Sequence, residues 1–172
     1  LLWKNKKGRV MRRFLRIPSL LIFVLLIFQF SRAETTQITN FDELMTVLKK
    51  GKIVRVIIDY GKCQLISDNE IQERSPNAIG GMTMETFEYF AKNALGRNQP
   101  FVVSSENKLI ANPKGEGYVY NYGKVRVDKD SKVKITVRYI DPKTYQNKMD
   151  ESFYTEMNNG KNGGAASFYY SK

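Results

Sequence analysis

The spacing of hydrophobic positions changes twice along the chain. From Ile17 to Phe30 they form an apolar run, after residue 40 they recur three and four residues apart, and from Ile53 onward they mostly alternate with polar residues. Spacings of three and four are typical of an amphipathic helix, and alternation is typical of a half-buried strand. The pattern predicts a hydrophobic leader, one helix and then a series of strands.

The helix is predicted over residues 41–50. Asn40 followed three residues later by Glu43 matches a capping box, in which the two side chains satisfy free backbone N–H groups of the first turn. Lys49 and Lys50 suit the negative end of the helix dipole, and Gly51 suits its termination. One apolar stripe on this helix packs against the rest of the domain.

Strands follow the helix at a spacing typical of an all-β domain. The segment 53–60 is rich in β-branched residues and is predicted to be buried on both faces, and residues 67–81 are predicted to form the longest loop. Further strands are predicted at 83–90, 100–105, 108–112, 118–127, 132–140, 148–157 and 165–171.

The predicted fold class is mainly β, an antiparallel meander forming a barrel, half-barrel or sandwich, with one short N-terminal amphipathic helix. Segments rich in Gly, Pro, Asn and Asp separate the strands. Gly80-Gly81 and Gly115-Glu116-Gly117 match neither a dinucleotide fingerprint nor a phosphate loop, and both are predicted to be turns.

The hairpin across residues 125–135 has a predictable register. If Val127 faces Val133, the same face continues into a core, and the opposite face sets Arg126 against Lys134. Like charges directly opposite each other cost a few tenths of a kcal/mol. The Arg126–Lys134 pair is therefore predicted to destabilise the hairpin slightly, unless a nearby acidic group or an anionic partner offsets the repulsion.

The leader has the three parts of a signal peptide: a basic segment, an apolar core and small residues before a cleavage site, here Ser31 and Ala33. We predict cleavage between Ala33 and Glu34, which leaves residues 34–172 as a single β-rich domain. The alternative is a permanent anchor, but the apolar run is short of the roughly 20 residues that a spanning helix needs. The expected location is periplasmic or secreted, with no membrane anchor after cleavage.

Most of the positive charge belongs to the leader. The whole chain carries a net +11, whereas 20 basic and 17 acidic residues remain without residues 1–33, a net of +3. The basic composition therefore does not indicate a nucleic-acid partner.

The sequence contains no histidine, which excludes Ser-His-Asp and Cys-His nucleophilic sites and His-based metal sites. The single Cys63 is interpreted as a buried small residue, with a reactive or intermolecular thiol as the alternative. Asp59, at the end of a strand, is expected to bond backbone groups of the turn at Gly61 and Lys62. We expect no metal, no cofactor and no enzymatic activity; a carboxylate-based enzyme is the remaining catalytic alternative.

Two sets of side chains are candidates for binding. A tyrosine ladder at Tyr118, Tyr120 and Tyr122 either packs across strands or lines a ligand cavity. A basic face is either solvated or binds an anionic partner such as a lipid headgroup or an acidic protein surface. The basic candidates are Lys124, Arg126, Lys134 and Arg138.

Several strings resemble the VirK family of small exported bacterial proteins. They are VRVIIDYGKC (54–63), AIGGMTMETFEYF (78–90), KLIANPKGEGYVYNYGKVRV (108–127) and ITVRYIDPKTY (135–145). The resemblance implies an association with virulence and an action in the cell envelope or outside the cell. It implies no catalytic residue, cofactor or ligand.

The sequence therefore predicts an exported, virulence-associated, non-enzymatic binding or interaction protein of a host-associated bacterium. Its partner is an unidentified protein, lipid or small apolar ligand. The alternative is a calycin-like carrier of a small apolar molecule. An enclosed apolar cavity of about 300 Å³ or more favours the carrier, and a filled core with an exposed aromatic or basic face favours the interaction protein.

Overall fold

The computed structural model describes residues 34–67 and 70–171. The chain divides into two units, residues 1–34 and 35–172, and all described residues except Glu34 belong to the second. The predicted signal peptide, residues 1–33, lies outside the described residues, so its cleavage stays a prediction. Among the residues described, no helix has the length and apolar character needed to cross a bilayer.

The strands of the second unit form two sheets, and all pairs between named strands are antiparallel. The four-stranded sheet, here called sheet A, has the order β1 (Thr35–Ile38), β11 (Ala166–Ser171), β2 (Val54–Asp59) and β5 (Ile79–Met84). The seven-stranded sheet, sheet B, has the order β4 (Glu70–Ile71), β3 (Gln64–Ser67), β10 (Asn147–Glu156), β9 (Lys132–Ile140), β8 (Tyr118–Asp128), β7 (Phe101–Ala111) and β6 (Glu88–Phe90).

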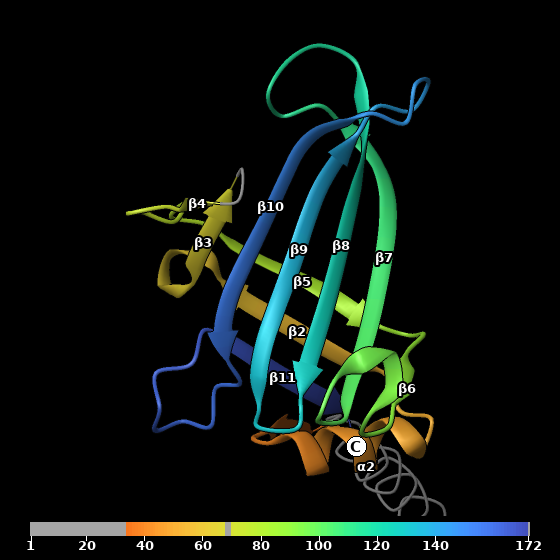
Figure 1. Cartoon of the computed structure of the whole chain (residues 1–172), viewed down its shortest axis with the longest axis vertical. Helices are drawn as coiled ribbons and strands as arrows, with labels where there is room; N and C mark the ends of the chain where they lie inside the picture. Colours follow the sequence, from red (N-terminus) through yellow and green to blue (C-terminus); the bar gives the residue numbers. More distant parts are fainter. Residues whose placement is uncertain (1–33, 68–69, 172) are drawn as a thin grey trace, which may run out of the picture. The chain divides into compact units, whose positions relative to one another are not determined.

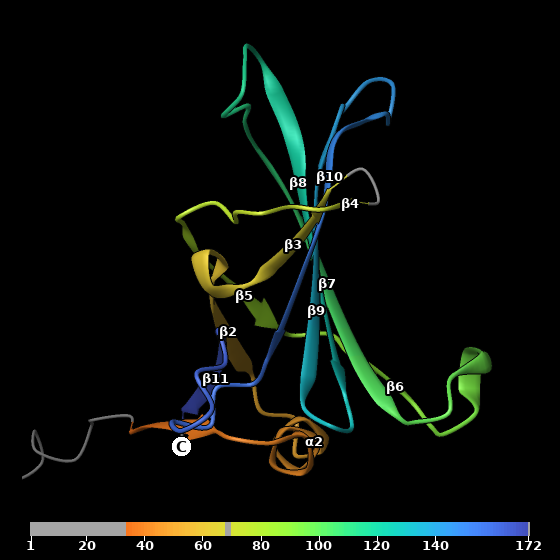
Figure 2. The same ribbon diagram turned by 60° about the vertical axis from the view of Figure 1, so that its left-hand side comes forward.

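The strands of sheet A cross behind those of sheet B, and the long strands β7 to β10 continue beyond β5 at one end (Figures 1 and 2). The helix α2 (Phe41–Lys49) lies at the opposite end. Two short 3-10 turns, η1 (Tyr60–Lys62) and η2 (Ala94–Gly96), complete the elements. The predicted mainly β class is confirmed, and the two sheets do not close into a barrel.

The helix forms where the capping pattern predicts it. The Asn40 side chain accepts a hydrogen bond from the Glu43 N–H at 3.0 Å, and the Glu43 carboxylate accepts one from the Thr39 N–H at 2.8 Å. This second bond lowers the pKa of Glu43 below its ordinary value. The first bond satisfies a donor that the first helical turn leaves free, and the second fixes the residue before the N-cap to that turn.

The core lies between the facing sides of the two sheets and the apolar stripe of α2. Burial of these side chains supplies the main stabilisation of the domain. Among the largest buried side chains are Ile38, Leu44, Leu48, Val54, Val56, Ile58, Met84, Val102, Val125, Ile135 and Phe168.

The prediction that segment 53–60 is buried on both faces is wrong. Val54, Val56 and Ile58 are buried, whereas Arg55 is exposed and Ile57 is 49% exposed, so β2 buries one face only. Among the described residues, no helix or sheet covers the outer face of sheet A (Figure 1). A run of β-branched residues reports strand propensity and does not distinguish one buried face from two.

The predicted strand 83–90 is also wrong, as is the predicted turn at Gly80-Gly81. Both glycines lie within β5 of sheet A, and the chain then bends at residues 85–87 before β6 joins sheet B. The loop predicted over 67–81 is correspondingly shorter, because it contains β4 and the start of β5. Strand β5 thus begins at Ile79, directly before the two glycines that were predicted to form a turn.

The strands predicted at 100–105 and 108–112 are one continuous strand, β7. The polar residues Glu106 and Asn107 read as a break, but β7 pairs with β8 without interruption across them. The strands β1, β3 and β4 were not predicted, because each has two to four residues. By contrast, β8, β9, β10 and β11 lie within one or two residues of their predicted bounds.

Candidate functional site

Alternation along β8 separates two faces of sheet B. Val119, Val125 and Val127 are buried on the inner face toward sheet A. Tyr118, Tyr120, Tyr122, Lys124 and Arg126 alternate with them and point to the outer face. No other sheet covers this face, and the segment before β7 packs over one end of it, at Phe101 and Asp128 (Figure 1). The predicted tyrosines and the predicted basic residues of β8 therefore share one outer face.

The tyrosine ladder lies at one end of that face. Tyr118 is 65% exposed, and Tyr120 and Tyr122 are partly exposed. Tyr120 is paired in register with Leu109, itself 56% exposed. None of the three tyrosines is among the residues that line the cleft between the sheets, so their accessible surface faces away from it.

The predicted register of the β8–β9 hairpin is confirmed. Val127 pairs with Val133, and Arg126 lies directly opposite Lys134. Lys124 is opposite Thr136, and Arg138 is opposite Tyr122, so both Lys134 and Arg138 are diagonal neighbours of Lys124. The four predicted basic residues thus form one cluster on two adjacent strands.

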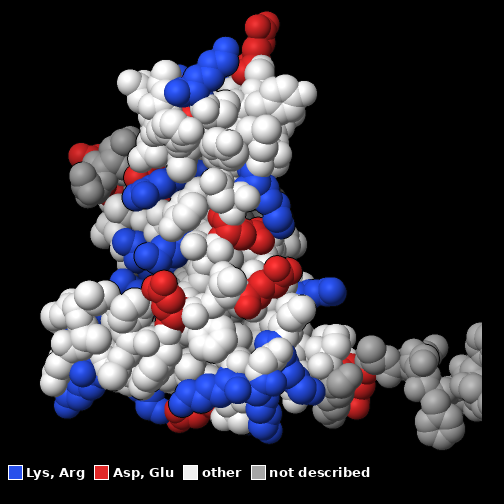
Figure 3. Space-filling model, turned by 90° about the vertical axis from the view of Figure 1, so that its right-hand side faces the viewer, with Lys and Arg blue, Asp and Glu red and all other residues white. Residues whose placement is uncertain are grey.

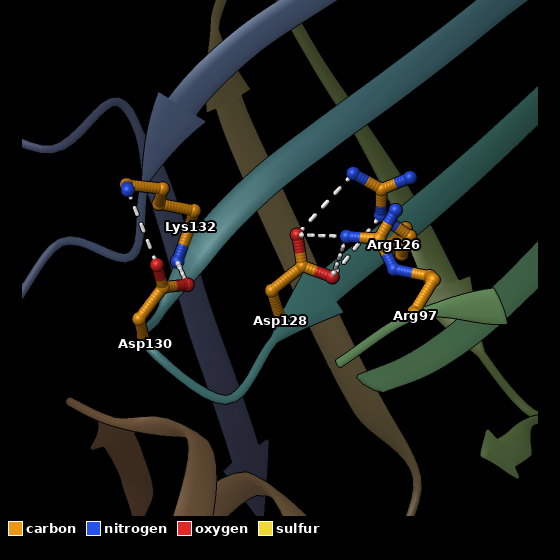
Figure 4. A network of polar contacts seen from close by, with 5 residues as sticks. All are labelled: Arg97, Arg126, Asp128, Asp130 and Lys132. Carbon is orange, nitrogen blue, oxygen red and sulfur yellow. Dashed lines mark hydrogen bonds and ion pairs between the residues drawn. The ribbon is translucent and has the colours of Figure 1, made fainter. Parts of the chain in front are cut away.

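Arg126 is held by a buried carboxylate at the end of β8. Asp128 is 5% exposed, and its oxygens lie 3.1 and 3.2 Å from Nη2 of Arg97 and 3.2 Å from Nη2 of Arg126 (Figure 4). Arg97 also stacks over the Phe101 ring, 5.2 Å from its centroid. This pair of guanidinium groups on one carboxylate relieves the Arg126–Lys134 repulsion and ties the segment before β7 to β8.

The remaining cations differ in their partners. Arg138 pairs with Asp150 at 3.0 Å, and Lys134 lies 5.2 Å from the centroid of the Tyr154 ring on β10. Lys124 has no acidic partner among the described residues. Lys124 can therefore bind an anionic partner without breaking an ion pair within the protein.

The positive cluster does not continue around the edge of sheet B. Figure 3 shows the side on which β6 and β7 lie, where Lys and Arg are interspersed with Asp and Glu over most of the surface. Basic side chains gather again only toward the end of the domain where α2 lies.

A cleft of about 510 Å³ lies between the sheets, on their facing sides. The sequence did not predict its residues, because they come from seven strands, the η1 turn and two loops. Ile58, Gly80 and Met82 of sheet A face Val137 and Tyr139 of sheet B across it. The other lining residues are Tyr60, Leu65, Pro76, Ala78, Gly81, Glu106, Lys114, Asn121, Gly123, Ile135, Met149, Glu151 and Phe153.

Tyr60 forms one wall of the cleft. Its ring packs on Phe153, with 4.6 Å between the centroids, and also against Gly80, where an added Cβ would lie 2.7 Å from the Tyr60 Cε2 atom. Burial, followed by the nearby Cys63, Tyr139 and Glu151, raises the pKa of Tyr60 to about 12. The phenol is therefore neutral and able to donate a hydrogen bond at physiological pH.

Two carboxylates lie at the ends of a line of four paired residues that crosses sheet B along the cleft. Glu106, Gly123, Val137 and Glu151 are register partners on β7, β8, β9 and β10. Glu106 pairs with Lys108 at 3.2 Å, and Glu151 lies 3.7 Å from the Lys114 amine. The cleft is open and has charged groups in its wall, unlike the enclosed apolar cavity expected of a carrier.

Cys63 and Asp59 lie beside the cleft rather than in it. Cys63 is 7% exposed and belongs to the core, and burial, followed by the charge of Asp59, raises the pKa of the thiol to about 11. The prediction that Asp59 bonds backbone groups of the turn is wrong: its carboxylate pairs instead with the Lys62 amine at 2.8 Å. Within the described part of the chain, no group of three acidic, Cys or His side chains could hold a metal ion.

Comparison with known proteins gives one family and one structure. The profile of a family described as VirK protein matches residues 37–145. The crystal structure of a VirK family protein from Legionella pneumophila is similar in fold, with a TM-score of 0.57 and 16% sequence identity. The similarity covers 77% of this chain and 97% of that one. No curated protein matches the sequence.

Proposed function

The chain belongs to the VirK family, and from this premise we propose that it is an exported, virulence-associated protein that acts by binding and not by catalysis. Membership of the family supports the association with virulence. The predicted signal peptide over residues 1–33 supports action in the periplasm or outside the cell, and an intact mass beginning at Glu34 is the expected product. The absence of histidine from the sequence supports a non-enzymatic role.

The binding surface in this proposal is the outer face of sheet B, and the partner is anionic. The observation that carries it is that the tyrosines and the four basic residues lie together on one uncovered face of β8 and β9. Tyrosine combines apolar contact with a polar tip, which suits partly hydrated interfaces. Neighbouring cations that cost stability in the free protein favour an anionic partner, which offsets their repulsion.

Lys124→Glu tests the proposal, because Lys124 has no acidic partner to lose. We expect weaker retention on vesicles containing phosphatidylglycerol, or on immobilised polyglutamate, with a loss that shrinks as salt rises. Lys161→Glu makes the same charge change in the exposed loop between β10 and β11 and serves as the control. Equal retention of both variants on both supports contradicts the proposed surface.

A carrier of a small apolar ligand is the second candidate. The cleft between the sheets favours it, because its volume of about 510 Å³ is large enough for a small molecule. Its open mouth and its charged lining residues Glu106, Lys114 and Glu151 favour it less. A carrier should bind an apolar dye in the cleft with no dependence on Lys124.

A further inference from the structure

Strand β5 has a neighbour on one side only. It is the last strand of sheet A and pairs with β2 along residues 79–84. Its other edge faces the region where the strands of sheet B continue beyond sheet A (Figures 1 and 2). An uncovered strand edge offers a row of backbone donors and acceptors to another chain.

The hydrogen bonds of β2 show which groups lie at that edge. The Tyr60 N–H donates to the Ala78 carbonyl at 2.9 Å on the β5 side, and the Asp59 N–H donates to the Ala165 carbonyl at 3.0 Å on the β11 side. Backbone groups alternate in direction along a strand, so Ile58, Val56 and Val54 direct theirs toward β5.

Their register partners Gly80, Met82 and Met84 therefore direct their backbone groups toward β2. The N–H and C=O groups of Ile79, Gly81 and Thr83 point to the free edge. Over residues 34–67 and 70–171, no side chain or turn forms a hydrogen bond with them.

The cleft runs beside this edge. Gly80, Gly81 and Met82 line it from β5, and Gly123 and Val137 line it from sheet B. The part of β8 from Gly123 to Tyr118 is about 17 Å long at 3.4 Å per residue, and an added strand occupies about 4.8 Å. A strand placed beside β5 would extend sheet A over inner-face residues of sheet B that sheet A leaves partly exposed.

We propose that the free edge of β5 and the adjoining cleft bind an extended segment of a partner protein by strand addition. Ile79, Gly81 and Thr83 supply the backbone ladder, and alternate side chains of the segment enter the cleft. This surface is separate from the outer face of sheet B, and the inference does not depend on the role proposed for that face.

The cleft indicates the chemistry of the segment. Val137 and Met82 offer apolar contact to its inward residues. Glu106 and Glu151 are each paired with a lysine whose side chain is mostly exposed, 66% for Lys108 and 62% for Lys114. A Lys or Arg of the segment can replace these exposed partners, so we expect inward apolar residues flanked by basic ones. A small apolar ligand would leave the edge groups of β5 unpaired.

Thr83→Pro is the decisive variant. Proline removes only the N–H that points to the free edge, and edge positions of this kind tolerate proline. Thr83→Val keeps the N–H and the branched shape, so it is the matched control. Ile79→Pro makes the same change at the other end of the edge and gives a second reading should Thr83→Pro fold poorly.

The probe is a displayed library of random twelve-residue peptides selected on the wild-type protein. We expect enriched peptides to bind wild type and Thr83→Val alike, to bind the folded proline variant at least about tenfold more weakly, and to slow amide exchange at Ile79, Gly81 and Thr83. Lys124→Glu should leave this binding intact. Enriched peptides that bind the proline variants as well as wild type, a selection that yields no peptide, or unprotected edge amides would overturn the inference.

Discussion

Gly80 shows how a single missing side chain shapes the cleft. The Tyr60 ring occupies the space that a Cβ on Gly80 would need, at 2.7 Å from Cε2. Both residues line the cleft, so the glycine sets the position of the aromatic wall. The sequence alone favoured a turn at Gly80-Gly81, because two adjacent glycines are more common in turns than within strands.

Gly80→Ala should therefore lower the free energy of unfolding by about 1–3 kcal/mol, the usual range for overpacking a fitted site. Gly123→Ala is the control on the opposite wall, where the nearest atom to an added Cβ is the Met82 sulfur at 4.0 Å. We expect the control to change stability by less than about 0.5 kcal/mol in urea unfolding. Equal effects at both positions would show that Tyr60 does not depend on Gly80.

Cys63 should behave as a core residue. Because burial raises its pKa to about 11 from 9.0, the neutral thiol stabilises the folded state below about pH 9, and this contribution is lost as the pH rises through 11. We expect slow alkylation by iodoacetamide at pH 8 and a smaller alkaline loss of stability in Cys63→Ala. Rapid labelling, or a dimer that reductant dissolves, would instead indicate an accessible thiol.

At the scale of elements, the strand bounds were predicted best where apolar and polar residues alternate along a strand and a polar turn follows it. The β8–β9 hairpin has both features, with Val125 and Val127 facing Ile135 and Val133 across a turn at residues 129–131. The path from β5 to β6 could not be predicted, because a change of sheet at residues 85–87 leaves no break in the local pattern. The polar residue Glu106 was predicted to follow the end of a strand. Its place in the cleft could not be predicted, because the other cleft residues come from strands distant in sequence.

The Asp128 network links elements that propensity alone would not bring together. Removing its charge leaves the Arg97 and Arg126 guanidinium groups partly buried without a carboxylate. Asp128→Asn should therefore cost about 2 kcal/mol of stability, less than a fully buried pair because both arginines are partly exposed. Asp130→Asn, in the same turn and paired with exposed Lys132, should cost less than about 0.5 kcal/mol. Similar losses in both variants would contradict the assigned role of Asp128.

At the scale of the whole domain, two open surfaces result from one arrangement. No other sheet covers the outer face of sheet B, and because sheet B is wider and longer than sheet A, part of its inner face extends beyond β5. The sequence predicted which residues occupy the outer face, since alternation fixes them. It could not predict the cleft, whose walls depend on how the two sheets cross.

The tyrosine rings test the proposed binding face most directly, because six of the ten fall into two sets on opposite faces of sheet B. Tyr118, Tyr120, Tyr122 and Tyr154 lie on the outer face of sheet B, and Tyr60 and Tyr139 line the cleft. The measurement is the NMR spectrum of protein with isotopically labelled tyrosine, titrated with vesicles containing phosphatidylglycerol at low salt. Binding through the outer face predicts broadening of the first set while the cleft pair stays sharp. Changes confined to Tyr60 and Tyr139, or no change in either set, would contradict it.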